Sequence, residues 1–230
     1  MNLRKFESLE AASAVLAAQV AGALRLALAE RACASLVVPG GRTPAALFRA
    51  LRAAALDWER VRVTLTDERW VPEDHPASNA ALVRRELLAD AAAAAVFVPL
   101  YNGAASAAEG AAASWRAIAS AGLPFDAVVL GMGEDGHFAS LFPDSPGIVQ
   151  SLDAGAIPGC VVMRAPVMPT ERLSLNLSAL TGSSQLSLLV TGADKLALLE
   201  RAAATPRSLA LPVAALLALR NPEVEVLWAP

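Results

Sequence analysis

The sequence predicts one α/β domain over residues 1–230, in which a mostly parallel sheet is covered by helices on both faces. Two observations carry this prediction. Short, strongly apolar runs alternate with segments of helical periodicity, and unbroken apolar runs are typical of strands that are buried on both faces. In addition, several of these runs end in glycine-containing turns that carry polar side chains. The sequence therefore favours a three-layer architecture with a ligand site at one edge of the sheet.

The first expected element is a long helix over 8–31, with Ser8 as its cap and an apolar stripe along one face. The remaining helices are expected at 44–52, 78–88, 105–119, 194–203 and 213–219. Strands are expected at 35–38, 61–65, 96–98, 126–130, 160–163, 173–177, 186–190 and 224–227. The strand at 173–177 alternates apolar and polar residues, which indicates an edge or antiparallel strand. The Pro- and Gly-rich stretch 143–158 is expected to be a long surface loop, either lying over the site or serving as a plain connector.

Composition excludes several classes of protein. The 230 residues are 55% hydrophobic with a net charge of −3 and no Lys/Arg-rich run, which argues against nucleic acid as the main partner. Two cysteines are too few for a disulfide framework and suit a reducing compartment. No uninterrupted apolar stretch indicates a membrane span or secretory signal. We expect a cytoplasmic protein, either a monomer or a small homo-oligomer, with a small-molecule partner.

The turn from Gly131 to His137 carries the strongest candidate for a catalytic base. It follows an apolar run directly, which places it at the carboxyl edge of the sheet, where open α/β sheets bind ligands. Imidazole suits proton transfer near neutral pH, and the only other histidine is His75. Asp135 lies two residues before His137. The alternative interpretation is a tight turn with an exposed histidine.

A second turn, 39–44, has the features of an anion site. Gly40 and Gly41 expose backbone N–H groups at the start of a helix, and Arg42 adds a positive charge. Thr43 is expected to cap this helix, with a proline at the first helical position. Phosphate is the expected ligand of this turn. The alternative interpretation is an ordinary strand-to-helix turn without a ligand.

Other strand ends contribute further charged candidates. Lys195 is expected in the first turn of a helix, where a cation opposes the helix dipole, so that a bound anion would explain its position. A solvent-exposed lysine is the alternative. The segment 66–72 brings Asp67 and Arg69 to another strand end, although a solvated loop with a local ion pair has the same composition. Arg172, just before a strand, is a further cation.

Several kinds of site are excluded by spacing. Gly131, Gly133 and Gly136 match G-x-G-x-x-G, but the intervening Glu134 and Asp135 would repel a pyrophosphate and no apolar helix follows. No Cys/His cluster has metal-ligand spacing. No G-x-S-x-G elbow and no Walker-type lysine occur. The spacing therefore favours neither a zinc site nor a dinucleotide site.

Taken together, the turns resemble those of the 6-phosphogluconolactonase family, in the same order along most of the chain. Residues 40–44 resemble its GGSTP loop, and 66–72 resemble its D-E-R-x-V-P segment, followed by an H-x-x-S-N stretch at 75–79. Residues 131–143 resemble G-M-G-x-D-G-H-T-A-S-L-F-P, and 171–175 with 191–195 complete the set. Two positions depart from the pattern, because Arg42 replaces a serine and Phe138 replaces a threonine. The first exchanges a hydroxyl for a charge at the phosphate loop, and the second removes a polar side chain beside the base.

The resemblance implies a Rossmann-like fold and hydrolysis of 6-phosphoglucono-1,5-lactone in the oxidative pentose phosphate pathway, without a cofactor. It implies that His137 activates water, and that Asp135 or Asp67 orients the imidazole. Arg69 or backbone N–H groups would stabilise the oxyanion. The residues expected to hold the 6-phosphate are Gly40, Gly41, Arg42, Thr43 and Lys195, with Arg172 as a weaker candidate.

Two other functions are compatible with similar turns. In amino-sugar-phosphate deaminases the corresponding turn resembles G-x-G-x-D-G-H-I-A-F-N-E-P, which has an acid shortly after the histidine. In this chain no acid follows His137 before Asp144. A non-catalytic sugar-phosphate sensor would keep Lys195 and the Gly40 turn but would not need the pair of Asp135 and His137. Lactone hydrolysis is therefore the interpretation that the residues favour.

Overall fold

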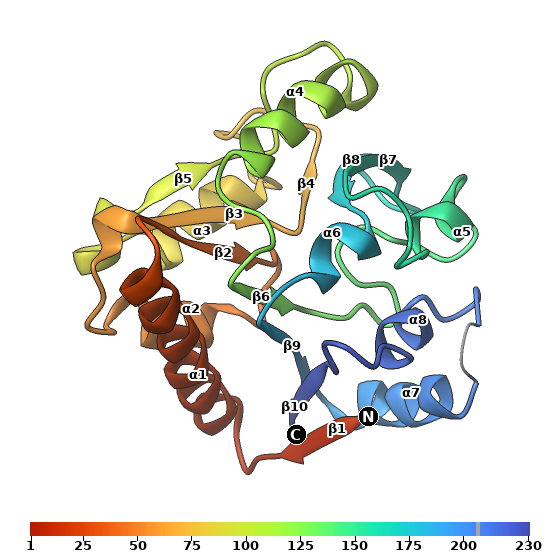
Figure 1. Cartoon of the computed structure of the whole chain (residues 1–230). Coiled ribbons are helices and arrows are strands. Elements are labelled where there is room, and N and C mark those ends of the chain that lie inside the picture. Colours follow the sequence, from red (N-terminus) through yellow and green to blue (C-terminus); the bar gives the residue numbers. More distant parts are fainter. Residues whose placement is uncertain (206–207) are drawn as a thin grey trace.

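The computed structural model of the chain describes residues 1–205 and 208–230. Its main sheet has seven strands in the order β1-β10-β9-β6-β2-β3-β5, and every neighbouring pair is parallel (Figure 1). The strands are β1 (Asn2–Lys5), β2 (Ala34–Val38), β3 (Val61–Leu65), β5 (Val96–Val98), β6 (Ala127–Leu130), β9 (Gln185–Thr191) and β10 (Glu225–Ala229). The predicted parallel sheet is confirmed.

A second, antiparallel sheet has the order β4-β8-β7. It consists of β4 (Asp67–Arg69), β7 (Cys160–Arg164) and β8 (Glu171–Leu175). The antiparallel strand predicted from alternation is confirmed in β8. Its predicted end at residue 177 is wrong, because the Asn176 side chain accepts a hydrogen bond from the Ala179 N–H (3.0 Å) and so starts helix α6 (Leu177–Thr181).

Helices cover the main sheet on both sides, as predicted (Figure 1). Helices α1 and α2 lie on one side, and α6, α7 and α8 lie on the other. Besides α6, the helices are α1 (Leu9–Glu30), α2 (Ala45–Arg52), α3 (Asn79–Glu86), α4 (Ala107–Ala119), α5 (Ile148–Ser151), α7 (Ala193–Ala204) and α8 (Val213–Leu217), with 3-10 turns at Trp58–Arg60 and Asp90–Ala94.

Helix α1 is the main element on its side of the sheet. The Ser8 hydroxyl accepts a hydrogen bond from the Ala11 N–H, which confirms the predicted cap. Leu16, Val20 and Leu24 are fully buried, and the helix contacts β2, β9 and β10. Among the described residues, α1 is the one helix long and apolar enough to cross a membrane. Its buried stripe packs against the sheet, as in the core helix of a folded domain.

The order of the strands creates a crevice between β2 and β6. After β2 the chain continues to β3 and β5 on one side, and it then returns to place β6 and β9 on the other side. The turns that follow β2 and β6 therefore diverge, and in open α/β sheets ligands bind where the carboxyl ends of such strands separate. This position lies between the two glycine-rich turns singled out in the sequence.

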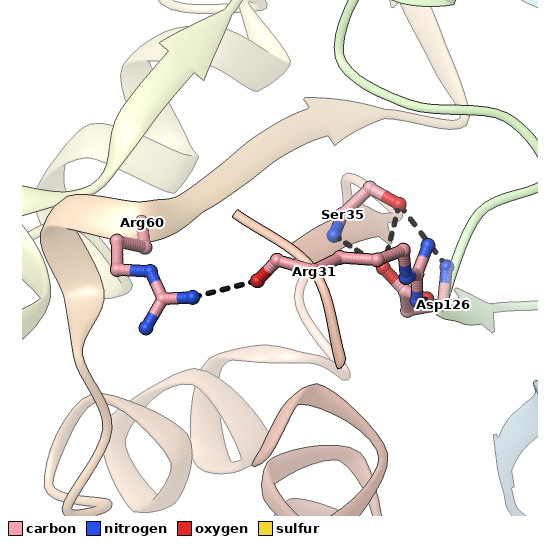
Figure 2. Close-up of polar contacts among 4 residues, drawn as sticks. All are labelled: Arg31, Ser35, Arg60 and Asp126. Atoms are coloured by element: carbon pink, nitrogen blue, oxygen red, sulfur yellow. Dashed lines mark hydrogen bonds and ion pairs between the residues drawn. The ribbon is translucent and has the colours of Figure 1, made fainter. Parts of the chain in front are cut away.

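A polar cluster ties β2 and β6 together at the opposite edge of the sheet (Figure 2). The Asp126 carboxylate accepts hydrogen bonds from the N–H (2.8 Å) and hydroxyl (3.1 Å) of Ser35 and forms an ion pair with Arg31. Arg60 donates to the Arg31 carbonyl (2.6 Å) and so adds the start of β3 to the cluster. These contacts fix the amino ends of the strands whose carboxyl ends form the crevice.

Three local predictions are wrong. Thr43 does not cap α2, because Pro44 takes the cap position with a helical backbone and without a side-chain hydrogen bond. The stretch 143–158 is not only a loop, since it contains α5, which buries Ile148 against the core. The segment 66–72 is not only a turn, since it contains β4.

Strand β4 is joined to α3 by the fully buried side chain of Glu68. Its carboxylate accepts hydrogen bonds from the N–H groups of Arg69 (2.8 Å), Asn79 (2.8 Å) and Ala80 (2.7 Å), and from the Ser78 hydroxyl (3.2 Å). Burial raises the pKa of Glu68, while the backbone N–H donors act against that rise. Since every partner is a donor, the geometry suits the ionised carboxylate at the start of a helix.

Replacing Glu68 with glutamine is expected to lower the free energy of unfolding by about 2–3 kcal/mol. The amide can accept through only one atom, so buried donors at the start of α3 lose their partner. Denaturant unfolding measures the effect. The control is Glu59→Gln at an exposed position, expected to stay within about 0.5 kcal/mol of the parent. Equal stability of the two variants would contradict an anchoring role for Glu68.

Candidate active site

A cavity of about 280 Å³ opens at the carboxyl ends of β2, β3, β6 and β9. Most of the predicted site residues line it: Gly40, Gly41, Arg42, Thr43, Asp67, Arg69, His137 and Lys195. The walls also include Pro39, Pro44, Asn79, Gly131, Met132, Gly133, Ala139 and Leu189. Segments far apart in the sequence therefore meet at the crevice that the strand order creates.

The imidazole of His137 is held by Asp135 on one side. The Asp135 Oδ1 lies 2.5 Å from His137 Nδ1 and also accepts the His137 backbone N–H (3.1 Å). Partial burial raises the pKa of Asp135, but the hydrogen bond and charge of His137 outweigh burial and leave this pKa below its ordinary value. The ionised carboxylate favours a proton on Nδ1, so that Nε2 keeps its lone pair. A histidine in this state can accept a proton from water.

Packing fixes the plane of the same imidazole. A β carbon on Gly133 would overlap the His137 ring, so only glycine fits at that point of the turn. On another side the ring contacts Phe142, with a centroid separation of 4.3 Å. The His137 side chain is still 27% exposed, which leaves it accessible from the cavity that it lines.

The other candidate partner of His137, Asp67, is engaged elsewhere. Its carboxylate accepts hydrogen bonds from the hydroxyls of Thr66 (2.8 Å) and Ser140 (2.5 Å). No hydrogen bond or ion pair joins Asp67 to His137 within residues 1–205 and 208–230. Of the two alternatives that the sequence leaves open, the structure places Asp135 in contact with the imidazole and Asp67 on the cavity wall.

The turn after β2 offers backbone donors to the cavity. Gly41 has a φ of +90°, a conformation that favours glycine. The N–H groups of Gly41, Arg42 and Thr43 have no acceptor among the described residues. Arg42 is exposed at the rim. Lys195 lines the same cavity from the first turn of α7, where its Nζ donates to the Met132 carbonyl (2.6 Å). Together these groups can bind an anion.

Two arginines lie side by side on β4 and β8. Arg69 lines the cavity and donates to the Ala77 carbonyl (2.5 Å), and its Nε has no partner within the described chain. Arg172 is its direct cross-strand neighbour and is 5% exposed. Burial lowers the pKa of Arg172, and the charge of Arg69 lowers it further. Arg172 is not among the residues that line the cavity, in contrast to Arg69 and the turn at Gly40.

Several other residues of interest lie away from the chemistry. His75 is exposed, and its Nδ1 accepts the Ala77 N–H (3.1 Å), a local turn contact. Phe138 is fully buried in the core, so its departure from the family pattern does not alter the polarity of the cavity. Burial raises the pKa of Cys160 to about 12. Within the described residues, no group of three or more His, Cys, Asp or Glu side chains is arranged to hold a metal ion.

In the sequence, Asn79 is only the last residue of the H-x-x-S-N stretch, but in the structure it is buried on the cavity wall. Asn79 lies at the start of α3, 39 positions after Gly40, and no local pattern connects the two. Ser140, whose hydroxyl donates to Asp67, is likewise only part of the family pattern in the sequence. A structure is needed to find both, because their partners are distant in sequence.

The fold and the cavity define an α/β enzyme that combines an imidazole–carboxylate pair with an anion-binding turn. Residues 7–228 match the family described as glucosamine-6-phosphate isomerases/6-phosphogluconolactonase. The chain belongs to this family.

Similar proteins come from several bacteria. A 6-phosphogluconolactonase of Pseudomonas aeruginosa is 47% identical over 215 residues, covering 94% of this chain and 89% of its own. One from Rhizobium meliloti is 41% identical and covers 100% of this chain and 99% of its own. The crystal structure of a 6-phosphogluconolactonase from Shewanella baltica OS155 superposes with a TM-score of 0.94 at 38% identity, over 99% of this chain and 97% of its own. The predicted family is confirmed.

Proposed function

We propose that this enzyme hydrolyses 6-phospho-D-glucono-1,5-lactone to 6-phospho-D-gluconate, the lactonase step of the oxidative pentose phosphate pathway. The observation that carries this function is the single cavity that holds both His137, paired with Asp135, and the anion-binding turn at Gly40. The names of the full-length relatives at 41–47% identity support the same reaction.

The phosphate is assigned to the turn after β2. The free N–H groups of Gly41, Arg42 and Thr43 and the ammonium of Lys195 supply donors and positive charge at one end of the cavity. A phosphate held there anchors the far end of the substrate. Anchoring turns the attack of water into a reaction between groups already in place, which lowers the entropic part of the barrier.

The reaction is assigned to His137 and Arg69. The His137 Nε2 removes a proton from water as the water oxygen attacks the lactone carbonyl carbon. The guanidinium of Arg69, which lines the cavity, stabilises the oxyanion of the tetrahedral intermediate. The intermediate then collapses, the bond between the carbonyl carbon and the ring oxygen breaks, and the protonated His137 returns the proton to the departing oxygen. Arg172, the cross-strand neighbour of Arg69, adds positive potential next to it.

Replacing Asp135 with asparagine is expected to lower kcat by roughly 10- to 100-fold, because the amide no longer fixes the Nδ1–H tautomer. Initial rates corrected for spontaneous hydrolysis measure the effect. Glu134→Gln, an exposed acid in the same turn, should leave kcat unchanged. A kcat of the Asp135→Asn variant equal to that of the parent would contradict the pairing of Asp135 with the base.

The competing chemistry in this family is amino-sugar-phosphate isomerisation and deamination. After His137 the chain continues with the buried apolar side chains of Phe138 and Leu141, and no carboxylate occupies this stretch. An assay of both reactions separates the functions. The enzyme is expected to accelerate lactone hydrolysis above the spontaneous rate and to release no ammonia from glucosamine 6-phosphate. Ammonia release without lactone hydrolysis would overturn the proposed function, and binding of 6-phosphogluconate without either reaction would favour a sensor.

A cytoplasmic location and a metabolic small-molecule partner are part of the same proposal. Cys33 and Cys160 are both free thiols, which is compatible with a reducing compartment. The sugar-phosphate lactone is the partner that the cavity accommodates.

A further inference from the structure

We propose that Asn79 is the positioning residue that sets the spacing between the anion-binding turn and the reacting end of the cavity. This inference rests on the proposed function, and it assigns a role to a side chain that does not take part in the chemistry. It follows from how closely the Asn79 carboxamide packs against Gly40.

The first observation concerns the space at Gly40. All three end atoms of the Asn79 carboxamide lie within 2.5 Å of the point where a β carbon on Gly40 would stand. The carboxamide therefore fills the place of the missing side chain. Gly41 is a glycine for a different reason, because its φ is +90° while a β carbon there would meet nothing within 4 Å. Glycine is required at position 40 because the Asn79 side chain occupies the space of a β carbon, and at position 41 because of the positive φ angle.

The second observation concerns how Asn79 itself is held. The side chain is 3% exposed, and its Nδ2 donates to the Asp67 carbonyl oxygen (2.9 Å) on β4. Its backbone N–H donates to the buried Glu68 carboxylate (2.8 Å). A carboxamide must turn its nitrogen toward a carbonyl acceptor, so this contact fixes which way the group faces. Asn79 is thereby locked to the strand that carries Asp67 and Arg69.

The two observations make the carboxamide a spacer between two parts of one cavity. Gly40, Asp67 and Asn79 all line that cavity. On one side of Asn79 lies the turn assigned to phosphate, and on the other lies the strand that supplies Arg69. A phosphorylated lactone is held at both ends, so the separation of these parts decides whether its carbonyl meets the water and Arg69. Misplacement by about 1 Å can cost roughly 100-fold in rate.

The test is a double-mutant cycle with Gly40→Ala and Asn79→Ala, assayed on the lactone with and without the phosphate. Each single change is expected to lower kcat/KM for the phosphorylated lactone about 10-fold more than for gluconolactone, because only the phosphorylated substrate depends on the spacing. The methyl group that Gly40→Ala introduces competes with the carboxamide for one space. Adding Gly40→Ala to Asn79→Ala should therefore cost no more than about 3-fold further.

Two outcomes would overturn this role. One is a double variant whose loss is the product of the single losses. The other is an equal loss on both lactones in each single variant. Asn102→Ala is the matched control, since the Asn102 carboxamide also donates to a backbone carbonyl, that of Gly110 (2.9 Å), but lies outside the cavity. It should lower the melting temperature and leave the ratio between the two lactones unchanged.

A binding measurement separates failure of this inference from failure of the proposed function. Calorimetric titration with 6-phosphogluconate and with gluconate needs no turnover. We expect each single variant to bind 6-phosphogluconate more weakly, and the double variant to lose less affinity than the product of the two single losses. Asn79→Asp keeps the volume of the side chain and replaces the donor with a charge, so it serves if Asn79→Ala does not fold. Asn79→Asp should weaken the binding of 6-phosphogluconate at least about 10-fold more than the binding of gluconate. Equal weakening of both ligands would contradict the role.

Discussion

His137→Ala is expected to lower kcat for 6-phosphogluconolactone by about 10²- to 10⁴-fold, the usual contribution of a positioned general base. The variant loses the only imidazole on the cavity wall, and the neighbouring carboxylate of Asp135 stays where it is. Because the anion-binding turn is separate from this residue, the affinity for 6-phosphogluconate should change much less than kcat. Initial rates corrected for spontaneous hydrolysis, together with calorimetry, measure the two effects.

His75→Ala is the matched control for His137→Ala. His75 is the only other histidine, and its ring makes a turn contact at an exposed position. This variant should keep full activity. If His137→Ala retained the kcat of the parent, water would have to be activated by another group, and the mechanism given above would be wrong.

Lys195→Ala is expected to raise KM for the phosphorylated lactone by about 10- to 100-fold, since a hydrogen bond to a charged group contributes about 1.5–3 kcal/mol. The hydrogen bond from the Lys195 ammonium to the Met132 carbonyl fixes the position of the ammonium at the cavity before the substrate binds. The effect on gluconolactone, which has no phosphate, should be much smaller. Increasing ionic strength should raise KM for the phosphorylated lactone more in the parent than in the Lys195→Ala variant.

Lys5→Ala provides the control for charge, because Lys5 is the only other lysine in the chain and is exposed on β1. It should leave both KM values unchanged. Equal increases in KM for the two lactones on Lys195→Ala would show that Lys195 acts on something other than the phosphate.

Two strands of the parallel sheet, Val61–Leu65 and Val96–Val98, could be predicted with the bounds that the structure has. Both are short segments rich in β-branched and aromatic residues, and such segments are typical of strands. Strand β1 was missed, since Asn2–Lys5 lies at the sheet edge and is largely exposed, with no apolar run. Strand β4 was missed because three charged residues become a strand only through pairing with β8.

The main walls of the site could be predicted because three of its turns follow strands of a parallel sheet. Parallel strands bring their carboxyl ends to one edge, so Gly40, His137 and Lys195 were expected to converge there, and all three line the cavity. The sequence could not choose between Asp135 and Asp67. The choice depends on Ser140, whose hydroxyl occupies Asp67 from 73 positions away. The spacing role of Asn79 depends on a similarly distant contact with Gly40.

The most direct test of the central claim is kcat/KM of the unmodified enzyme for 6-phosphogluconolactone and for gluconolactone, each freshly generated and corrected for spontaneous hydrolysis. A cavity that joins a general base to a phosphate-binding turn predicts fast hydrolysis of the phosphorylated lactone and at least about 100-fold slower hydrolysis of gluconolactone. Equal values for the two lactones, or no acceleration of the phosphorylated one, would contradict the account.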